Sequence, residues 1–219
     1  MAYWIYDNTP PDPRRADDNG LVALGGSLEP SFLLSAYRAG CFPWSSRPVL
    51  NWWCPEPRLL FELSTFRPHK SVQKRIRQEG WSFAIDRNFR AVMEACANTR
   101  RDTWITADIL EAYLELHRLG HAHSFEVYER EQLIGGLYGV SIGGYFGGES
   151  MFHLKTDASK AAVSFLIERL KASGYVLLDA QAPTPHLLSL GAVRVTRQEY
   201  LSRLQEALLI SAVPLVNAY

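Results

Sequence analysis

The chain has 219 residues, no formal net charge, 47% hydrophobic residues and 21% charged residues. This length allows one well-buried core with a small accessory unit, and this composition excludes an intrinsically disordered chain. Zero net charge excludes a global electrostatic field that attracts nucleic acid, although a local basic cluster could still bind it.

The cysteines and the chain ends indicate the compartment. Cys41, Cys54 and Cys96 are too few and too scattered for a disulfide framework, so we expect buried free thiols in a reducing environment. Residues 1–18 contain no apolar core typical of a signal peptide. The apolar stretch 207–216 is interrupted by a proline and is too short to span a bilayer. The sequence therefore predicts a soluble cytoplasmic protein.

The first sixty residues are rich in proline, glycine and tryptophan and have few long periodic segments. One short helix is expected at 31–39, because Pro30 opens it and Gly40 ends it. Aromatic packing is expected to hold this part together. We predict a small N-terminal domain, residues 1–60, followed by a larger domain, residues 61–219.

Helices and strands alternate from about residue 60 onward. Helices are expected at 70–79, 87–97, 107–119 and 158–172. Strands are expected at 81–85, 122–128, 132–140, 144–148, 176–181 and 192–196. Thr106 and Asp157 are the expected N-caps of the third and fourth of these helices. Because the central strands follow one another, the pattern predicts an antiparallel meander with helices packed on it.

Polar residues interrupt two of the apolar strand runs. Asp179 and Gln181 alternate along one strand, so their side chains should point to the same face about 7 Å apart. Glu149 follows two glycines near the end of another strand. Burying such groups costs free energy unless each finds a partner. The three residues therefore indicate a catalytic site, the alternative being polar strand ends that the backbone satisfies.

His117, His121 and His123 are the residues that would favour a metal. A zinc site needs three or four convergent ligands, but Gly120 ends the helix between the first two histidines, and the last two continue into a strand. We therefore expect no metal here. The dense glycines at 135–148 are interpreted as turns and bulges rather than as a phosphate cradle.

Basic and aromatic residues supply candidate contacts to nucleic acid. Lys70, Lys74 and Arg77 lie at helical spacing and could form one basic stripe, the alternative being an ordinary solvated helix face. Trp44 and Trp104 stand in loop-like contexts and could offer flat surfaces on which a base stacks.

Many short motifs in a fixed order carry a resemblance to a known family. They are GLVALGG at 20–26, FPW at 42–44, WWCPEPR at 52–58, TWIT at 103–106, LHRLGHAHS at 116–124, GGLYGV at 135–140, GESMF at 148–152, ASK at 158–160, DAQ at 179–181 and SLGA at 189–192. Together they resemble the leucyl/phenylalanyl-tRNA–protein transferase family over about residues 20–200.

The resemblance implies an α/β (α+β) fold. A small N-terminal domain would stand beside an acetyltransferase-like C-terminal domain, whose mixed, largely antiparallel sheet is flanked by helices. The implied reaction moves Leu, Phe or Met from aminoacyl-tRNA onto the N-terminal Arg or Lys of an acceptor protein. This transfer would mark the acceptor for degradation, so degradation machinery would be an indirect partner. No metal, organic cofactor or membrane is implied.

The resemblance also implies roles for individual residues. Asp179 with Gln181 would be the catalytic pair, the carboxylate orienting the amide that contacts the attacking amine, and Glu149 would hold a positive ammonium. The pocket for the donor side chain would be formed by Leu137, Phe146, Val163, Leu166 and Leu178. Trp44 and Trp104 would frame the terminal adenosine.

Two other functions remain open from the residues alone. An acyl-CoA-dependent N-acyltransferase would share the fold, but the backbone-amide run that binds a pyrophosphate at a helix start has no counterpart in the sequence. A non-catalytic tRNA- or peptide-binding module would bind tRNA without transferring an amino acid.

Overall fold

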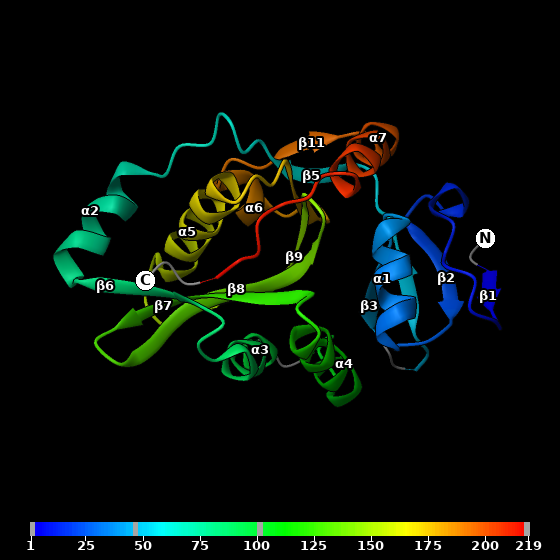
Figure 1. Ribbon diagram of the computed structural model, residues 1–219, viewed down its shortest axis with the longest axis horizontal. Helices are drawn as coiled ribbons and strands as arrows, with labels where there is room; N and C mark the ends of the chain where they lie inside the picture. The colour runs from blue at the N-terminus through cyan, green and yellow to red at the C-terminus, as the bar shows by residue number, and fades with distance from the viewer. Residues whose placement is uncertain (1–2, 46–47, 100–102, 217–219) are drawn as a thin grey trace.

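The computed structural model describes residues 3–45, 48–99 and 103–216 (Figure 1). These residues form two β-sheets and seven α-helices. The smaller sheet has the strand order β1-β2-β4-β3. Its strands are β1 (Tyr3–Ile5), β2 (Leu21–Gly25), β3 (Phe42–Ser45) and β4 (Asn51–Trp53). Helix α1 (Pro30–Arg38) packs against it, and a short 3-10 turn, Pro13–Arg15, precedes β2.

The larger sheet has seven strands in the order β11-β5-β10-β9-β8-β7-β6. Its strands are β5 (Arg58–Phe61), β6 (Trp81–Ile85), β7 (Ala122–Glu129), β8 (Gln132–Ile142), β9 (Tyr145–His153), β10 (Leu177–Gln181) and β11 (Val193–Val195). Only the β9–β10 pair among them is parallel. The expected fold class, a mixed and largely antiparallel sheet flanked by helices, is confirmed.

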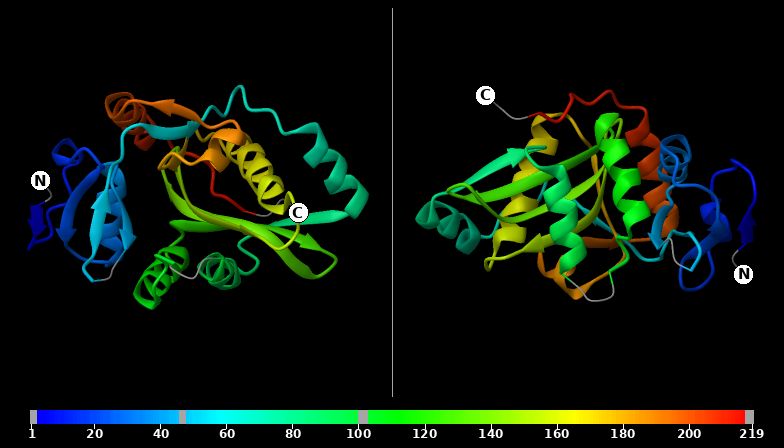
Figure 2. Two further views of the ribbon diagram at one scale, coloured as in Figure 1. Left: turned by 180° about the vertical axis from the view of Figure 1, so that it is seen from behind. Right: turned by 90° about the horizontal axis from the view of Figure 1, so that it is seen from below.

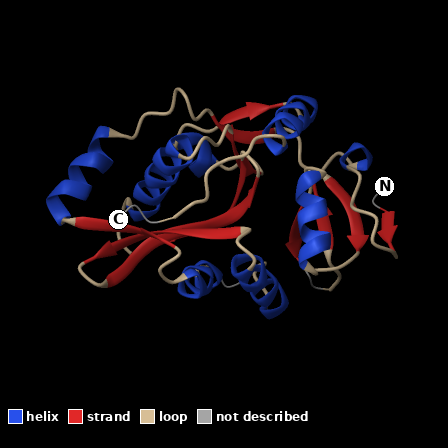
Figure 3. Ribbon diagram, in the orientation of Figure 1, coloured by secondary structure: helices blue, strands red, loops and turns tan. Residues whose placement is uncertain are grey.

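Helices cover both faces of the larger sheet (Figures 1 and 3). They are α2 (Lys70–Glu79), α3 (Phe89–Asn98), α4 (Ala107–Arg118), α5 (Ala158–Ala172), α6 (Pro185–Ser189) and α7 (Arg197–Leu208). Buried apolar side chains form two clusters. One cluster packs between α5 and the larger sheet, and the other includes side chains of α3, α4, α7 and the small sheet. Figure 2 shows the small sheet at one end of the larger one.

Glycines allow close packing around the central strands. A Cβ atom at Gly135 would lie 2.6 Å from the Cβ of Ala158, the first residue of α5. A Cβ atom at Gly139 would lie 2.3 Å from the carbonyl oxygen of Gly147 on β9. Such distances are far shorter than van der Waals contact. These two glycines therefore let α5 and β9 approach β8 closely.

Several expectations about the elements are confirmed. Helices 70–79 and 158–172 and strand 81–85 have the expected bounds. The meander is present in β6 to β9. Thr106 caps α4, since its hydroxyl accepts a hydrogen bond from the N–H of Ile109. The three cysteines are buried and free. No described helix has the length and apolarity needed to cross a bilayer.

Other expectations are wrong. The antiparallel meander does not continue from β9 to β10, because α5 crosses over the sheet and returns the chain parallel to β9, while β10 pairs antiparallel with β5. Asp157 stands at the N-cap of α5 with a φ of 71°, but its side chain makes no capping bond. Its carboxylate instead pairs with Lys160 at 2.8 Å and Arg75 at 3.4 Å. Helices α6 and α7 and strands β1 to β5 were not predicted. For the strands the reason is that short runs without clear alternation leave little periodic signal.

Candidate functional site

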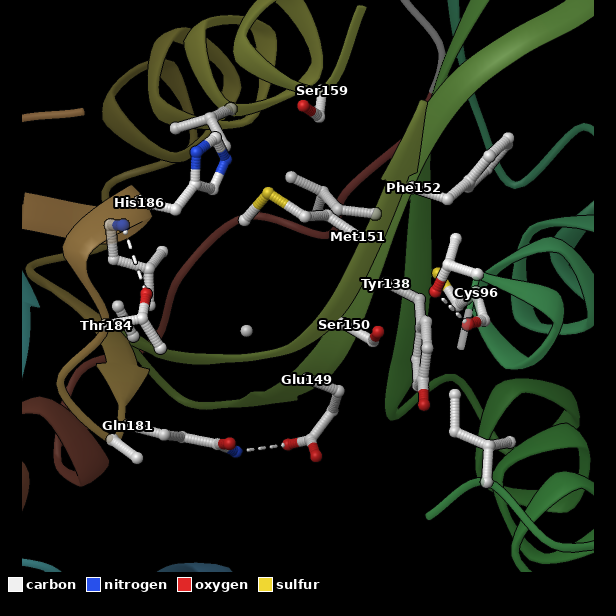
Figure 4. A pocket seen from close by; sticks show the side chains of 18 of the residues that line it. Cys96, Tyr138, Glu149, Ser150, Met151, Phe152, Ser159, Gln181, Thr184 and His186 are labelled. Carbon is white, nitrogen blue, oxygen red and sulfur yellow. Dashed lines mark hydrogen bonds between the residues drawn. The ribbon is translucent and has the colours of Figure 1, made fainter. Parts of the chain in front are cut away.

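A cavity of about 1260 Å³ lies between the small sheet, the end of α3, and strands β8, β9 and β10 (Figure 4). It is lined by apolar side chains from α5 and the sheet, together with a few polar ones. It brings together most of the site residues predicted from the sequence, which are Trp44, Trp104, Leu137, Glu149, Val163, Leu166, Leu178, Asp179 and Gln181. Residues as distant in the sequence as Trp44 and Gln181 thus meet at one place.

Phe146 is the member of the predicted pocket that lies outside the cavity lining. Its side chain is fully buried, and its ring packs edge-on against Phe125 with 5.7 Å between the ring centroids. On β9 it therefore supports the wall from behind, while the next residues of that strand reach the cavity.

Asp179 is held by an unusually large number of donors. Its side chain is fully buried, and Arg58 forms a two-pronged salt bridge with it, Nε to Oδ1 at 2.8 Å and Nη2 to Oδ2 at 2.6 Å. The hydroxyls of Tyr145 and Tyr200 donate to Oδ2 at 2.9 and 3.2 Å. The main-chain N–H of Gln181 donates to Oδ1 at 2.8 Å. A carboxylate offers about four lone-pair sites, so the five donors occupy all of the acceptor sites of Asp179.

Gln181 is placed by a break in strand regularity. The pairing of β10 with β5 shifts register between Asp179 and Gln181, and Gln181 has a φ of 60°. The expected contact between the Asp179 carboxylate and the Gln181 side-chain amide is replaced, since the carboxylate accepts the main-chain N–H. The side-chain Nε2 of Gln181 instead donates to Glu149 Oε1 at 2.8 Å (Figure 4).

Glu149 faces the cavity but its carboxyl is enclosed by tyrosines from two helices. Tyr37 of α1 lies 2.8 Å from Oε1, and Tyr113 of α4 lies 3.3 Å from Oε2. The two tyrosine hydroxyls also hydrogen bond to each other. Burial raises the pKa of Glu149, and the charge of Asp179 adds to this effect; against the lowering by the hydrogen bonds from Tyr37 and Tyr113 and by the charge of Arg58, the pKa is about 8. Glu149 therefore differs from an ordinary exposed carboxylate.

The sequence reasoning missed the residues that hold these polar groups, namely Arg58, Tyr145 and Tyr200 around Asp179 and Tyr37 and Tyr113 around Glu149. Of these residues, Arg58 was the one that the sequence could have indicated. It begins a strand whose other residues are apolar, and a buried arginine in such a run needs an anionic partner. Buried tyrosines look like ordinary core residues in a sequence.

The two tryptophans lie at the cavity on separate parts of the chain. Trp44 on β3 is 40% exposed, and its ring packs edge-on against Trp53 at 5.2 Å. Trp104 is half-buried and precedes α4. Both tryptophan side chains thus have surface available to a ligand.

The basic residues predicted on α2 form one exposed face, which we call the α2 basic face (Lys70, Lys74 and Arg77). None of the three forms an ion pair within the described part of the chain. Their neighbour Arg75 is different, because it pairs with Asp157 and donates to the carbonyl of Thr156. The α2 basic face is not part of the cavity lining.

The histidines have partners of their own. His123 Nδ1 lies 2.6 Å from Asp86 Oδ2, and His117 Nδ1 lies 2.8 Å from the carbonyl oxygen of Ala122. His117 also stacks on Phe89 with 4.3 Å between the ring centroids. Across residues 3–45, 48–99 and 103–216, no group of three or more His, Cys, Asp or Glu side chains is arranged to hold a metal ion.

Comparison with protein families gives two matches. Residues 60–205 match the model described as leucyl/phenylalanyl-tRNA protein transferase, and residues 26–56 match that of the leucyl/phenylalanyl-tRNA protein transferase N-terminal domain. Among curated proteins, the leucyl/phenylalanyl-tRNA–protein transferase of Shewanella denitrificans is 49% identical over 193 residues, which cover 87% of this chain and 82% of the relative. That of Hahella chejuensis is 45% identical over 210 residues, which cover 92% and 89%.

Solved structures resemble the chain more distantly. L-PGS from Bacillus licheniformis is 15% identical, covers 60% of this chain and 48% of its own, and has a TM-score of 0.44.

Proposed function

The chain belongs to the leucyl/phenylalanyl-tRNA–protein transferase family, and from this premise we propose which amino acids it transfers, to which acceptors, and with which residues. It is an aminoacyltransferase that moves an amino acid from tRNA to a protein N-terminus. The donors are Leu, Phe and Met, and the acceptors begin with Arg or Lys. The product is then a substrate for degradation, and the reaction takes place in the cytoplasm.

One observation carries this proposal, namely that a single cavity joins an apolar wall to the Glu149–Gln181 hydrogen bond. Leu137, Val163, Leu166 and Leu178 contribute to the apolar wall and would receive the donor side chain. Such a wall rejects charged and polar donors strongly, but separates donors that differ by one methylene by only about 1–3 kcal/mol. This supports a set of three apolar donors rather than one.

The attacking group is the α-amine of the acceptor. Its ordinary pKa of about 7.7–8.0 means that part of it is already neutral near pH 7. Its nitrogen forms a bond to the ester carbonyl carbon of the aminoacyl-tRNA, the bond to the ribose oxygen breaks, and that oxygen leaves as a hydroxyl carrying a proton lost by the amine. Positioning of the amine is therefore the main task of the protein.

Gln181 is the residue proposed to position the amine. Its Nε2 is occupied by Glu149, so its Oε1 is the atom left to accept an amine N–H and aim the nitrogen lone pair. Asp179 acts through Gln181, because its lone pairs are filled by Arg58, two tyrosines and the Gln181 main chain. We infer that Asp179 fixes the bulge that presents Gln181 and does not accept the proton.

The tRNA would contact two separate regions. Trp44 and Trp104 would frame the terminal adenosine at the cavity, where base–aromatic stacking is worth about 1–3 kcal/mol per base. The α2 basic face would contact phosphates of the tRNA body. The N-terminal domain, proposed as residues 1–60, would supply Trp44, and the catalytic domain, proposed as residues 61–219, the remaining groups.

A transfer assay tests this function. Labelled Leu, Phe or Met on tRNA is mixed with peptides that begin with Arg, Lys, Asp or Glu. We expect label on the Arg and Lys peptides alone, and a loss of about 10²–10³ in rate for Gln181→Ala. Transfer to the acidic peptides would overturn the acceptor assignment, and an unchanged rate in the variant would overturn the role of Gln181.

A further inference from the structure

Three groups form a closed triangle in the cavity wall, namely the hydroxyls of Tyr37 and Tyr113 and the carboxyl of Glu149. Each hydroxyl contacts one carboxyl oxygen, at 2.8 Å for Tyr37 and 3.3 Å for Tyr113, and the hydroxyls contact each other. Each of the three contacts needs one proton between its two oxygens. A tyrosine hydroxyl brings one proton, so an ionised Glu149 would leave the triangle one proton short.

A protonated carboxyl completes the triangle. Oε2–H of Glu149 then donates to Tyr113, the hydroxyl of Tyr113 donates to Tyr37, and the hydroxyl of Tyr37 donates to Oε1 of Glu149. Oε1 also accepts from Nε2 of Gln181 at 2.8 Å. Every proton then has one acceptor, and the carbonyl oxygen of the acid uses both of its lone pairs.

Glu126 shows that this shortage is not common to every buried glutamate of the chain. Its Oε1 accepts from the hydroxyl of Ser124 at 2.7 Å and from the N–H of Asn88 at 2.8 Å, and its Oε2 accepts from the hydroxyl of Tyr128 at 2.8 Å. Three donors bring three protons to three contacts. The proton count at Glu126 is complete without a proton on the carboxyl.

The charges around Glu149 favour the same state. The cation that acts on it is Arg58, but both prongs of that guanidinium already serve Asp179. An ionised Glu149 would therefore add a second anion to a site that is already neutral. The titratable groups that face it or act on it come from six elements and are Tyr37, Arg58, Tyr113, Tyr138, Tyr145 and Asp179.

We propose that Glu149 is a neutral acid in the empty enzyme and releases its proton when the cationic N-terminal residue of the acceptor enters the cavity. This inference rests on the proposed function, since it takes the acceptor to begin with Arg or Lys. The acceptor's positive charge replaces the proton as the charge that balances the carboxylate, and the proton passes to solvent. Acceptor binding and the loss of one proton are then a single event.

Proton release makes acceptor affinity depend on pH. Below the pKa of Glu149, about 8, the cation must displace the proton, so Kd for an Arg-initiated peptide falls about tenfold per pH unit as pH rises. Above that pKa the affinity levels off. A peptide with a neutral first side chain supplies less charge to balance the carboxylate, so it binds more weakly.

Carbon-13 NMR of the 219-residue chain, labelled at its glutamate carboxyl carbons, tests the proposal. The Glu149 signal is assigned as the one lost in Glu149→Gln, and Glu126→Gln is the matched control that removes a different buried glutamate. We expect the Glu149 signal of the free protein to titrate with a midpoint near 8. A signal that stays at the ionised position from about pH 5.5 upward would overturn the neutral acid.

The second half of the test adds a tetrapeptide that begins with Arg to wild-type protein at about pH 6.5, where a group of that pKa is over about 95% protonated. We expect the Glu149 signal to move to the ionised position, and about one proton to be released, as counted by calorimetry in buffers of different ionisation enthalpy. A bound peptide that leaves the signal protonated would overturn the release. The free-protein titration needs no acceptor, so a failure of the proposed function shows separately, in the transfer assay.

Discussion

Arg58→Met removes the guanidinium fork from Asp179 while keeping an apolar side chain of similar length. Both side chains are at most 1% exposed, so the carboxylate is left buried without a counter-charge. Breaking a buried ion pair from one side costs about 3–5 kcal/mol. Tyr145, Tyr200 and the Gln181 N–H continue to donate to Asp179, so we expect the lower end, about 3 kcal/mol.

Urea unfolding followed by circular dichroism measures this loss as a free energy of unfolding, and thermal unfolding measures it as a change in Tm. For a chain of this length, about 3 kcal/mol corresponds to a fall in Tm of roughly 6–12 °C. The double variant Arg58→Met with Asp179→Asn removes both charges of this buried pair and keeps an acceptor for the remaining donors. It should recover about 2 kcal/mol, yet transfer slowly. The reasoning would be refuted if Arg58→Met unfolded with a free energy within about 0.5 kcal/mol of wild type. It would also be refuted if the loss in the double variant equalled the sum of the losses from Arg58→Met and Asp179→Asn alone.

Three further predictions concern tRNA, donor size and pH. Replacing the three residues of the α2 basic face with Glu should weaken tRNA binding and reduce the slope of log K against log salt by up to about 3. The control Arg194→Glu, on the opposite edge of the sheet, should change neither quantity much, and equal effects of the two changes would show that the α2 basic face does not bind tRNA. Val163→Phe narrows the cavity and should lower kcat/KM for Phe about tenfold more than for Leu; an equal loss for both donors would remove Val163 from the donor pocket. Because the folded-state pKa of Glu149 is raised from 4.5 to about 8, the folded protein binds the extra proton between these values, so wild type should lose stability relative to Glu149→Gln as pH rises through that window; parallel urea-midpoint curves for the two proteins would contradict this.

Local signals predicted the ends of some helices well. Thr106 before an amphipathic run marked the start of α4, and Gly120 marked its end. The same kind of signal was wrong at Asp157, because two basic side chains compete for its carboxylate. The parallel placement of β10 depends on how α5 packs over the sheet, which is a tertiary property that no local pattern contains.

The candidate site divides in the same way. Asp179, Gln181 and Glu149 were recognisable because polar groups in apolar strands need partners. Their partners were not recognisable, because Tyr37 and Tyr113 approach Glu149 from helices 76 residues apart in the chain. The bulge at Gln181 also depends on pairing with β5, which strict alternation along β10 does not foresee.

Aminoacyl transfer is tested most directly by incubating the purified chain with tRNA charged with labelled Leu or Phe and a peptide that begins with Arg. Mass spectrometry of the peptide then locates the added residue. We expect one Leu or Phe joined to the α-amine of the Arg, made by wild type and slowed by Gln181→Ala. A peptide that stays unmodified while the charged tRNA binds would contradict the assignment and leave a non-catalytic tRNA-binding protein.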